Sequence, residues 1–248
     1  PCRVAAAKTA MASKPRAAAN AARLQRIARE AEAESANGRK AAILDVATDL
    51  FGRNGYHETT IKDIAAAAGI SSGLVYTYVE NKDDLLYQII ARSLEGYCTE
   101  MTRAIAGVRD PVNRFKIAYR TYCTGVLKNA HQTLLAFRHV VSLPKLVRDR
   151  IKALDAKSIL VLEAEIRACV EAGHFRKVEP FTAAAMAAHM AQAWPLKKWL
   201  LSARTSETEF VELALDMVLG SLCAHHVGAA HAAVPAGAPP ARARRRRA

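Results

Sequence analysis

The sequence lacks any uninterrupted apolar run of about 18 residues, the length that a membrane-spanning helix requires. It also lacks the apolar core of a signal peptide, because Lys8, Lys14 and Arg16 interrupt the alanines near the N-terminus. These absences argue against a membrane span and a secretion signal. We therefore expect a cytoplasmic protein without a membrane partner.

Cysteine is scarce, with five residues in a chain of 248, and no two of them form a C-x-x-C pair. This pattern predicts reduced thiols rather than disulfide bonds or a zinc site. The histidines His225, His226 and His231 have no neighbouring ligands at metal-binding spacing. We therefore predict neither a metal site nor a cofactor.

Strand signals and catalytic signatures are also missing. Only 12 glycines occur, no Val/Ile/Thr-rich segment alternates with polar residues, and much of the 51% apolar content is alanine. Abundant alanine favours helices, so the predicted fold class is all-α. No phosphate-binding loop, nucleophile elbow or pair of catalytic carboxylates is present, which predicts that the protein is not an enzyme.

Positive charge is plentiful but unevenly placed. The formal net charge is +13, yet residues 39–82 carry five basic and five acidic side chains and are neutral overall. Much of the excess lies in residues 1–37 and in the Arg-rich tail, residues 229–248. Two interpretations of residues 1–37 stay open: a disordered extension, or a basic arm that contacts DNA. Charge alone is therefore a weak argument for sequence-specific DNA binding.

The stretch from Thr60 to Lys82 has the pattern of two short helices joined by a turn. Thr60 is a suitable N-cap, and Asp63 completes a capping box. Gly69 can adopt the left-handed conformation that ends a helix, and Ser71 or Ser72 can cap the next helix. This order predicts a helix-turn-helix, which presents its second helix to a DNA major groove.

The segment from Arg39 to Leu86 resembles the DNA-binding domain of the tetracycline-repressor (TetR) family of bacterial regulators. The matching positions are Ala47, Phe51, Gly55, Thr59, Thr60, Ile64, Ala65, Ala68, Gly69, Tyr76, Tyr78, Lys82 and Leu85. The resemblance implies a helix-turn-helix domain over residues 38–83 and a helical domain for ligand binding and dimerisation over residues 84–228. It also implies a nucleoid-associated location.

Within this motif, some side chains suit the DNA backbone and others suit the bases. Phosphate contacts are predicted for Thr60, Tyr76, Tyr78 and Lys82, and for Arg39 and Lys40 at the start of the first helix. Groove contacts are predicted for Ser72, Gly73 and Thr77, and Leu74 offers apolar contact to a thymine methyl group. Ser71, at the start of this helix, is also predicted to bind DNA. The alternative for the tyrosines is packing against neighbouring helices, and the alternative for Arg39 and Lys40 is a solvated charged pair.

The family resemblance also implies an effector cavity in the second domain. Bulky side chains that can line it are Tyr97, Met101, Phe115, Tyr119, Tyr122, Phe137, Met186, Met190 and Trp194. Plain core packing is the alternative for each of them. The run from Trp194 to Trp199 resembles the branch that senses acyl-CoA thioesters, in which Lys197 and Lys198 can meet phosphates. The alternative for these two lysines, which the sequence favours, is a solvated helix end.

The last helix shows two apolar stripes, one through Phe210 and Met217 and another through Val211 and Val218. A helix that is apolar on two sides must bury both, which suits the two-fold helix bundle of the family. We therefore predict a homodimer formed by the last two helices.

Together these features predict a ligand-responsive repressor that leaves a palindromic, double-stranded DNA operator when a small apolar effector binds. An acyl-CoA-like thioester is one candidate effector. Two alternatives stay open: a nonspecific architectural DNA-binding protein driven by the basic tails, and an enzyme built on the C-terminal helices.

Overall fold

A computed structural model describes residues 37–223, and the predicted basic extension and Arg-rich tail lie almost wholly outside this range. The described chain is all-helical, as predicted, apart from turns and one isolated antiparallel bridge between Phe175 and Cys223. None of the helices in this range is long and apolar enough to cross a membrane.

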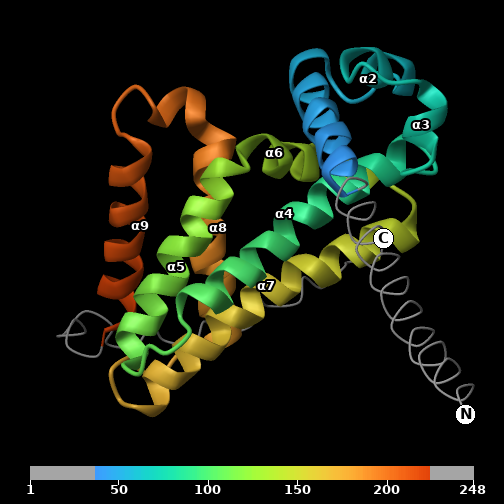
Figure 1. The fold of residues 1–248 in the computed structure, drawn as a ribbon. Helices are drawn as coiled ribbons and strands as arrows, with labels where there is room; N and C mark the ends of the chain where they lie inside the picture. The colour runs from blue at the N-terminus through green and yellow to red at the C-terminus, as the bar shows by residue number, and fades with distance from the viewer. Residues whose placement is uncertain (1–36, 224–248) are drawn as a thin grey trace, which may run out of the picture.

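The N-terminal helix covers residues 37–54 and is followed by the two helices of the predicted motif. These are α2 (Ile61–Ala67) and α3 (Ser72–Tyr76). The three helices lie together at one end of the molecule (Figure 1). The capping box is present, because the Thr60 side chain accepts from the Asp63 backbone N–H, and the Asp63 carboxylate accepts from the Thr60 backbone N–H.

The remaining helices pack around a second core. They are α4 (Lys82–Ala104), α5 (Pro111–Lys128), α6 (Ala130–His139), α7 (Lys145–Glu171), α8 (Pro180–Leu201) and α9 (Glu207–Leu222), with a short 3₁₀ helix, η1 (Val140–Ser142), between α6 and α7. α4 packs along both α5 and α7, whereas α9 lies at the far side of the molecule from α2 and α3 (Figure 1).

Local chemistry explains why these helices begin and end where they do. Asn81 caps α4, with Asp83 and Asp84 in its first turn, where the helix dipole favours negative charge. Ser206 and Glu209 form the predicted capping box of α9. α8 continues through Pro195, but Lys197 departs from helical geometry, with φ −125° and ψ 18°, so the predicted bend falls two residues later.

Two hydrophobic clusters hold the fold together. One joins the N-terminal helix, α2 and α3 to the first half of α4, and it also includes Leu135, Leu143 and Ile151. It therefore extends across the predicted domain boundary at residues 83 and 84. The other fills the space between α4, α5, α7, α8 and α9. Gly125 allows close approach of α5 to α4, because a Cβ atom there would lie 2.9 Å from the ring of Tyr97.

Candidate DNA interface and effector cavity

The helix-turn-helix is built on a small buried core that leaves one side of α3 in solvent. Ile64 of α2 and Val75 of α3 are fully buried. Gly69 adopts φ 67°, and the next residue, Ile70, donates its backbone N–H to the carbonyl of Ala65 at 3.0 Å. Ser71 then caps α3 by accepting from the Leu74 backbone N–H. This turn fixes the angle at which α3 is presented.

The exposed side of α3 carries most of the residues predicted to face DNA. Tyr76 is 54% exposed, an unusual position for a large aromatic side chain that serves only packing. Gly73 and Thr77 are exposed, and Ser72, Leu74 and Tyr78 are partly exposed. A Cβ atom at Gly73 would meet no atom closer than 3.9 Å, so the surface there is open. The Thr77 hydroxyl donates to the Leu74 carbonyl at 2.7 Å and keeps its lone pairs for other donors.

Lys82 has a different environment from the one that the sequence suggested. Its Nζ atom donates to the carbonyl oxygens of Tyr56, His57 and Thr59 at 2.9, 3.1 and 3.1 Å, and it lies 4.6 Å from the centre of the Tyr56 ring. An ammonium group has three N–H donors, and all three are used here. Lys82 thus ties α4 to the turn before α2, and in the free chain it offers no spare donor to a phosphate.

The other residues predicted to contact the DNA backbone are Thr60 and, at the start of the N-terminal helix, Arg39 and Lys40. The Thr60 hydroxyl and backbone N–H both donate to the Asp63 carboxylate, at 2.7 and 2.8 Å, and these bonds hold the pKa of Asp63 below its ordinary value. Arg39 is exposed. Lys40 lies in a groove between the N-terminal helix and α4.

A cavity of about 200 Å³ lies between α4, α5, α6, α7 and α8. Of the bulky residues predicted to line it, only Tyr97 and Phe137 do so. Five of the others are fully buried core side chains, because they face the hydrophobic cluster between α4, α5, α8 and α9. They are Met101, Phe115, Tyr119, Tyr122 and Trp194. Met190 packs against the same cluster, and Met186 is 70% exposed.

Most polar residues of the cavity wall were not predicted from the sequence. They are Ser93, Gln132, Thr133, Lys152, Asp155, His189 and Gln192. Burial raises the pKa of Asp155, and burial also raises the pKa of Tyr97 to about 12. A polar residue within an otherwise apolar helix face is the signal that could have found Asp155 and Gln192. Lys197 and Lys198 do not line this cavity, and Lys198 pairs with Glu207 at 3.2 Å.

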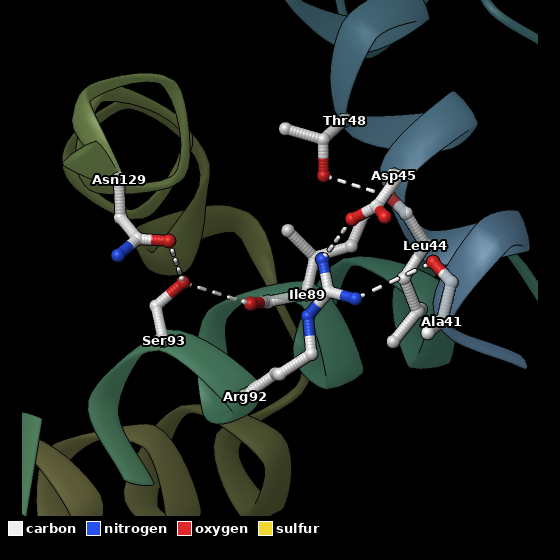
Figure 2. A network of polar contacts seen from close by, with 8 residues as sticks. All are labelled: Ala41, Leu44, Asp45, Thr48, Ile89, Arg92, Ser93 and Asn129. Atoms are coloured by element: carbon white, nitrogen blue, oxygen red, sulfur yellow. Dashed lines mark hydrogen bonds and ion pairs between the residues drawn. The ribbon is translucent and has the colours of Figure 1, made fainter. Parts of the chain in front are cut away.

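One turn of α4 connects the cavity wall with the N-terminal helix (Figure 2). Arg92 donates to the carboxylate of Asp45 and, at 3.3 Å, to the carbonyl of Ala41. The next residue, Ser93, lines the cavity. Its hydroxyl lies within hydrogen-bond distance of the Ile89 carbonyl, at 3.3 Å, and of the Asn129 side-chain oxygen, at 3.4 Å, where α5 meets α6. Neighbouring residues of α4 thus contact helices of both clusters.

An all-helical fold with an exposed recognition helix at one end and a cavity further along defines a DNA-binding regulatory protein of the helix-turn-helix class. The model of the family "Bacterial regulatory proteins, tetR family" matches residues 43–89. The HTH-type transcriptional regulator HbdR of Aromatoleum sp. (strain CIB) is 36% identical over 181 residues, which are 73% of this chain and 79% of that protein. The chain belongs to the TetR family of bacterial transcriptional regulators.

Solved structures support the same assignment. The TetR family regulator PfmR from Thermus thermophilus is 25% identical with a TM-score of 0.63, covering 71% of this chain and 96% of that one. AibR, solved in complex with isovaleryl coenzyme A and operator DNA, is 24% identical with a TM-score of 0.61, covering 75% and 98%. At 24% identity, the similarity to AibR shows the fold alone. Members of the family are transcriptional regulators and not enzymes, so the enzyme alternative is set aside.

Proposed function

We propose that this protein is a repressor whose operator binding is released by a small effector in the cavity between α4 and α8. The observation that carries the proposal is the course of α4. Its first residue, Lys82, holds the turn before the helix-turn-helix, and Ile90, Ser93 and Tyr97 further along the same helix line the cavity. A ligand that favours another position of α4 would therefore also favour another position of α3.

DNA recognition rests on α3 in this proposal. Tyr76, Tyr78 and Thr60 contact phosphates and set the register, with Arg39 and Lys40 alongside. Ser71, Ser72, Gly73, Leu74 and Thr77 face the base edges, and Leu74 offers apolar contact to a thymine methyl group. Residues 38–83 then act as the DNA-binding domain, and residues 84–228 bind the effector and form the dimer contact.

A homodimer through α8 and α9 supplies the two-fold symmetry of a palindromic operator. Large apolar side chains are exposed on these two helices, which favours a protein contact there. They are Phe181, Met186, Leu196, Trp199, Leu200, Leu213 and Met217. Effector binding would change the separation of the two α3 helices, so that both no longer fit the half-sites.

The proposed effector is small and mainly apolar at the end that enters the cavity. AibR binds isovaleryl coenzyme A, and a cavity of about 200 Å³ has room for a short acyl group but not for coenzyme A itself. A thioester effector would therefore place only its acyl group inside. We place the protein in the cytoplasm, at the nucleoid.

DNase footprinting of the full-length chain on DNA that flanks its gene tests the proposal. A protected palindrome that forms in moderate salt supports it, whereas the absence of any sequence-dependent protection contradicts it. The architectural alternative predicts that deleting residues 1–37 and 229–248 removes all DNA binding. The repressor proposal predicts that the protected palindrome survives these deletions with lower affinity.

A further inference from the structure

The cavity wall contains a carboxylate without a hydrogen-bond partner. Asp155 lies on α7, lines the cavity and is partly buried. No residue in the range 37–223 donates a hydrogen bond to its carboxylate or forms an ion pair with it, including Lys152 one turn earlier on the same helix. A carboxylate that is partly withdrawn from water without a donor is destabilised, and a ligand can supply the missing hydrogen bond.

Asp155 lines the cavity together with Tyr97 of α4 and His189 of α8. Its negative charge raises the pKa of Tyr97 on α4 and of Tyr122 on α5, after the larger effect of burial in each case. His189 on α8 acts in the opposite sense and lowers the pKa of Asp155, which burial raises more strongly. The carboxylate is therefore close to groups on three of the helices that surround the cavity.

Gln192 adds a second acceptor to the same wall. Its Nε2 atom donates to the Tyr122 hydroxyl at 3.3 Å, but its Oε1 atom is buried without a partner among the described residues. The amide nitrogen has a second N–H donor, but within residues 37–223 it makes no hydrogen bond to the Asp155 carboxylate. The wall thus presents two acceptors, one charged and one neutral, for which the described chain supplies no donor.

We infer that the effector group inside the cavity is about the size of a substituted benzene ring and carries a hydroxyl or N–H group that donates to Asp155, with Gln192 as a second acceptor. The size of the group that enters follows from the volume, because an enclosed cavity of about 150 Å³ admits benzene and this partly open one measures about 200 Å³. The chemistry follows from the two unpartnered acceptors. This inference rests on the proposed effector site and narrows it: a purely hydrocarbon acyl group would fill the space but leave Asp155 unpaired.

Phenol and toluene are suitable probes, because they have equal numbers of non-hydrogen atoms and differ in one hydrogen-bond donor. Binding to the full-length protein without DNA is measured by ligand-observed NMR titration, at the roughly millimolar concentrations expected for such small ligands. The ratio of phenol affinity to toluene affinity is compared between wild type and Asp155→Leu. Asp149→Leu removes a carboxylate from α7 outside the cavity and is the matched control.

We expect the phenol-to-toluene ratio to fall about ten-fold or more in Asp155→Leu and to stay within about two-fold in Asp149→Leu. Retained toluene binding shows that the variant cavity is intact. If Asp155→Leu binds neither probe, Gln192→Met is measured in its place, and the same fall in the ratio is expected because this substitution removes the second acceptor and keeps the volume.

An unchanged ratio in the variant that retains toluene binding overturns the inference. Failure of wild type to bind either probe also overturns it. Neither result bears on operator binding, which footprinting measures separately, so the repressor proposal can stand while the ligand class falls. Conversely, if the protein binds phenol through Asp155 but protects no DNA, the ligand site is supported and the proposed repressor function is contradicted.

Discussion

Arg92 on α4 donates a hydrogen bond to the carboxylate of Asp45 on the N-terminal helix, 47 residues earlier in the chain. The Asp45 side chain is 68% exposed, so the pair contributes no more than about 1 kcal/mol to stability. The role of the ion pair is geometric, because it fixes the N-terminal helix to the turn of α4 that also carries Ser93 (Figure 2).

Asp45→Ala is therefore expected to leave the melting temperature nearly unchanged and to weaken operator binding by about 0.5–2 kcal/mol. Fluorescence anisotropy with a labelled operator measures the second effect. Asp49→Ala is the matched control, since the ion pair of Asp49 with Arg53 lies within the N-terminal helix. Equal effects of the two substitutions would show that the link to α4 has no special role.

Lys82→Met is expected to destabilise the fold. Three backbone carbonyls lose their donor, and the bonds to Tyr56 and Thr59 are partly buried. An acceptor left unsatisfied in a buried position costs about 1–3 kcal/mol. Denaturant unfolding measures the loss. Lys62→Met, which removes an exposed lysine of α2, should change the free energy of unfolding by less than about 0.5 kcal/mol. A stable Lys82→Met protein that has lost DNA affinity would instead return Lys82 to the phosphate contacts predicted from the sequence.

Tyr76→Phe is expected to weaken binding to all DNA sequences by a similar factor, because a phosphate contact carries no sequence information. Ser72→Ala and Thr77→Val should instead change the preferred sequence. Selection of binding sites from a random duplex library separates the two effects. Tyr87→Phe on α4 serves as the control for loss of a tyrosine hydroxyl outside α3. A Tyr76→Phe protein with wild-type affinity would move Tyr76 to the packing residues.

Replacing both Leu213 and Met217 by Glu is expected to give a monomer. The two side chains are 57% and 56% exposed on α9, and two carboxylates in an apolar contact cannot be desolvated cheaply. Analytical ultracentrifugation measures the mass. Val141→Glu, at a 76% exposed apolar position away from α8 and α9, should leave the mass unchanged. A double variant that stays dimeric would place the contact on another surface.

The contact of α6 with the turn before α2 predicts a dependence of stability on pH. His139 packs 5.0 Å from Tyr56 and 5.5 Å from His57, measured between ring centres. Burial, and then the charges of His57 and Arg138, lower the pKa of His139 from its ordinary 6.5. The folded state thus favours the neutral imidazole, and this contribution to stability is complete above pH 6.5 and is lost as the pH falls below it.

His139→Gln should therefore show a shallower loss of stability between about pH 7 and pH 5 than wild type in denaturant titrations. His131→Gln removes an exposed histidine from the same helix and should follow the wild-type curve. Parallel curves for wild type and His139→Gln would contradict the assignment of this pH dependence to His139.

Local signals in the sequence predicted the helix-turn-helix well. The boxes formed by Thr60 with Asp63 and by Ser206 with Glu209 are both present, since they depend on residues only three positions apart. Gly69 has the predicted left-handed conformation for the same reason. The predicted all-α fold and family are confirmed.

The cavity wall could not be predicted in the same way. Trp194 and Phe115 are as bulky and apolar as Phe137, yet only Phe137 faces the cavity, because the direction of each side chain depends on how the helices cross. The three carbonyl partners of Lys82 are likewise more than 20 residues away in sequence, and the chain pattern gives no sign of them. Long-range packing decides both features.

The most direct test of the account compares the affinity of the full-length protein for the footprinted operator with its affinity for a scrambled duplex of equal length and composition. The comparison is made at about 50 and 200 mM salt. A repressor that reads DNA with α3 predicts a preference of about 1,000-fold or more for the operator at both concentrations. Equal affinities for the two duplexes, both collapsing as salt rises, would contradict the account and favour nonspecific binding through the basic tails.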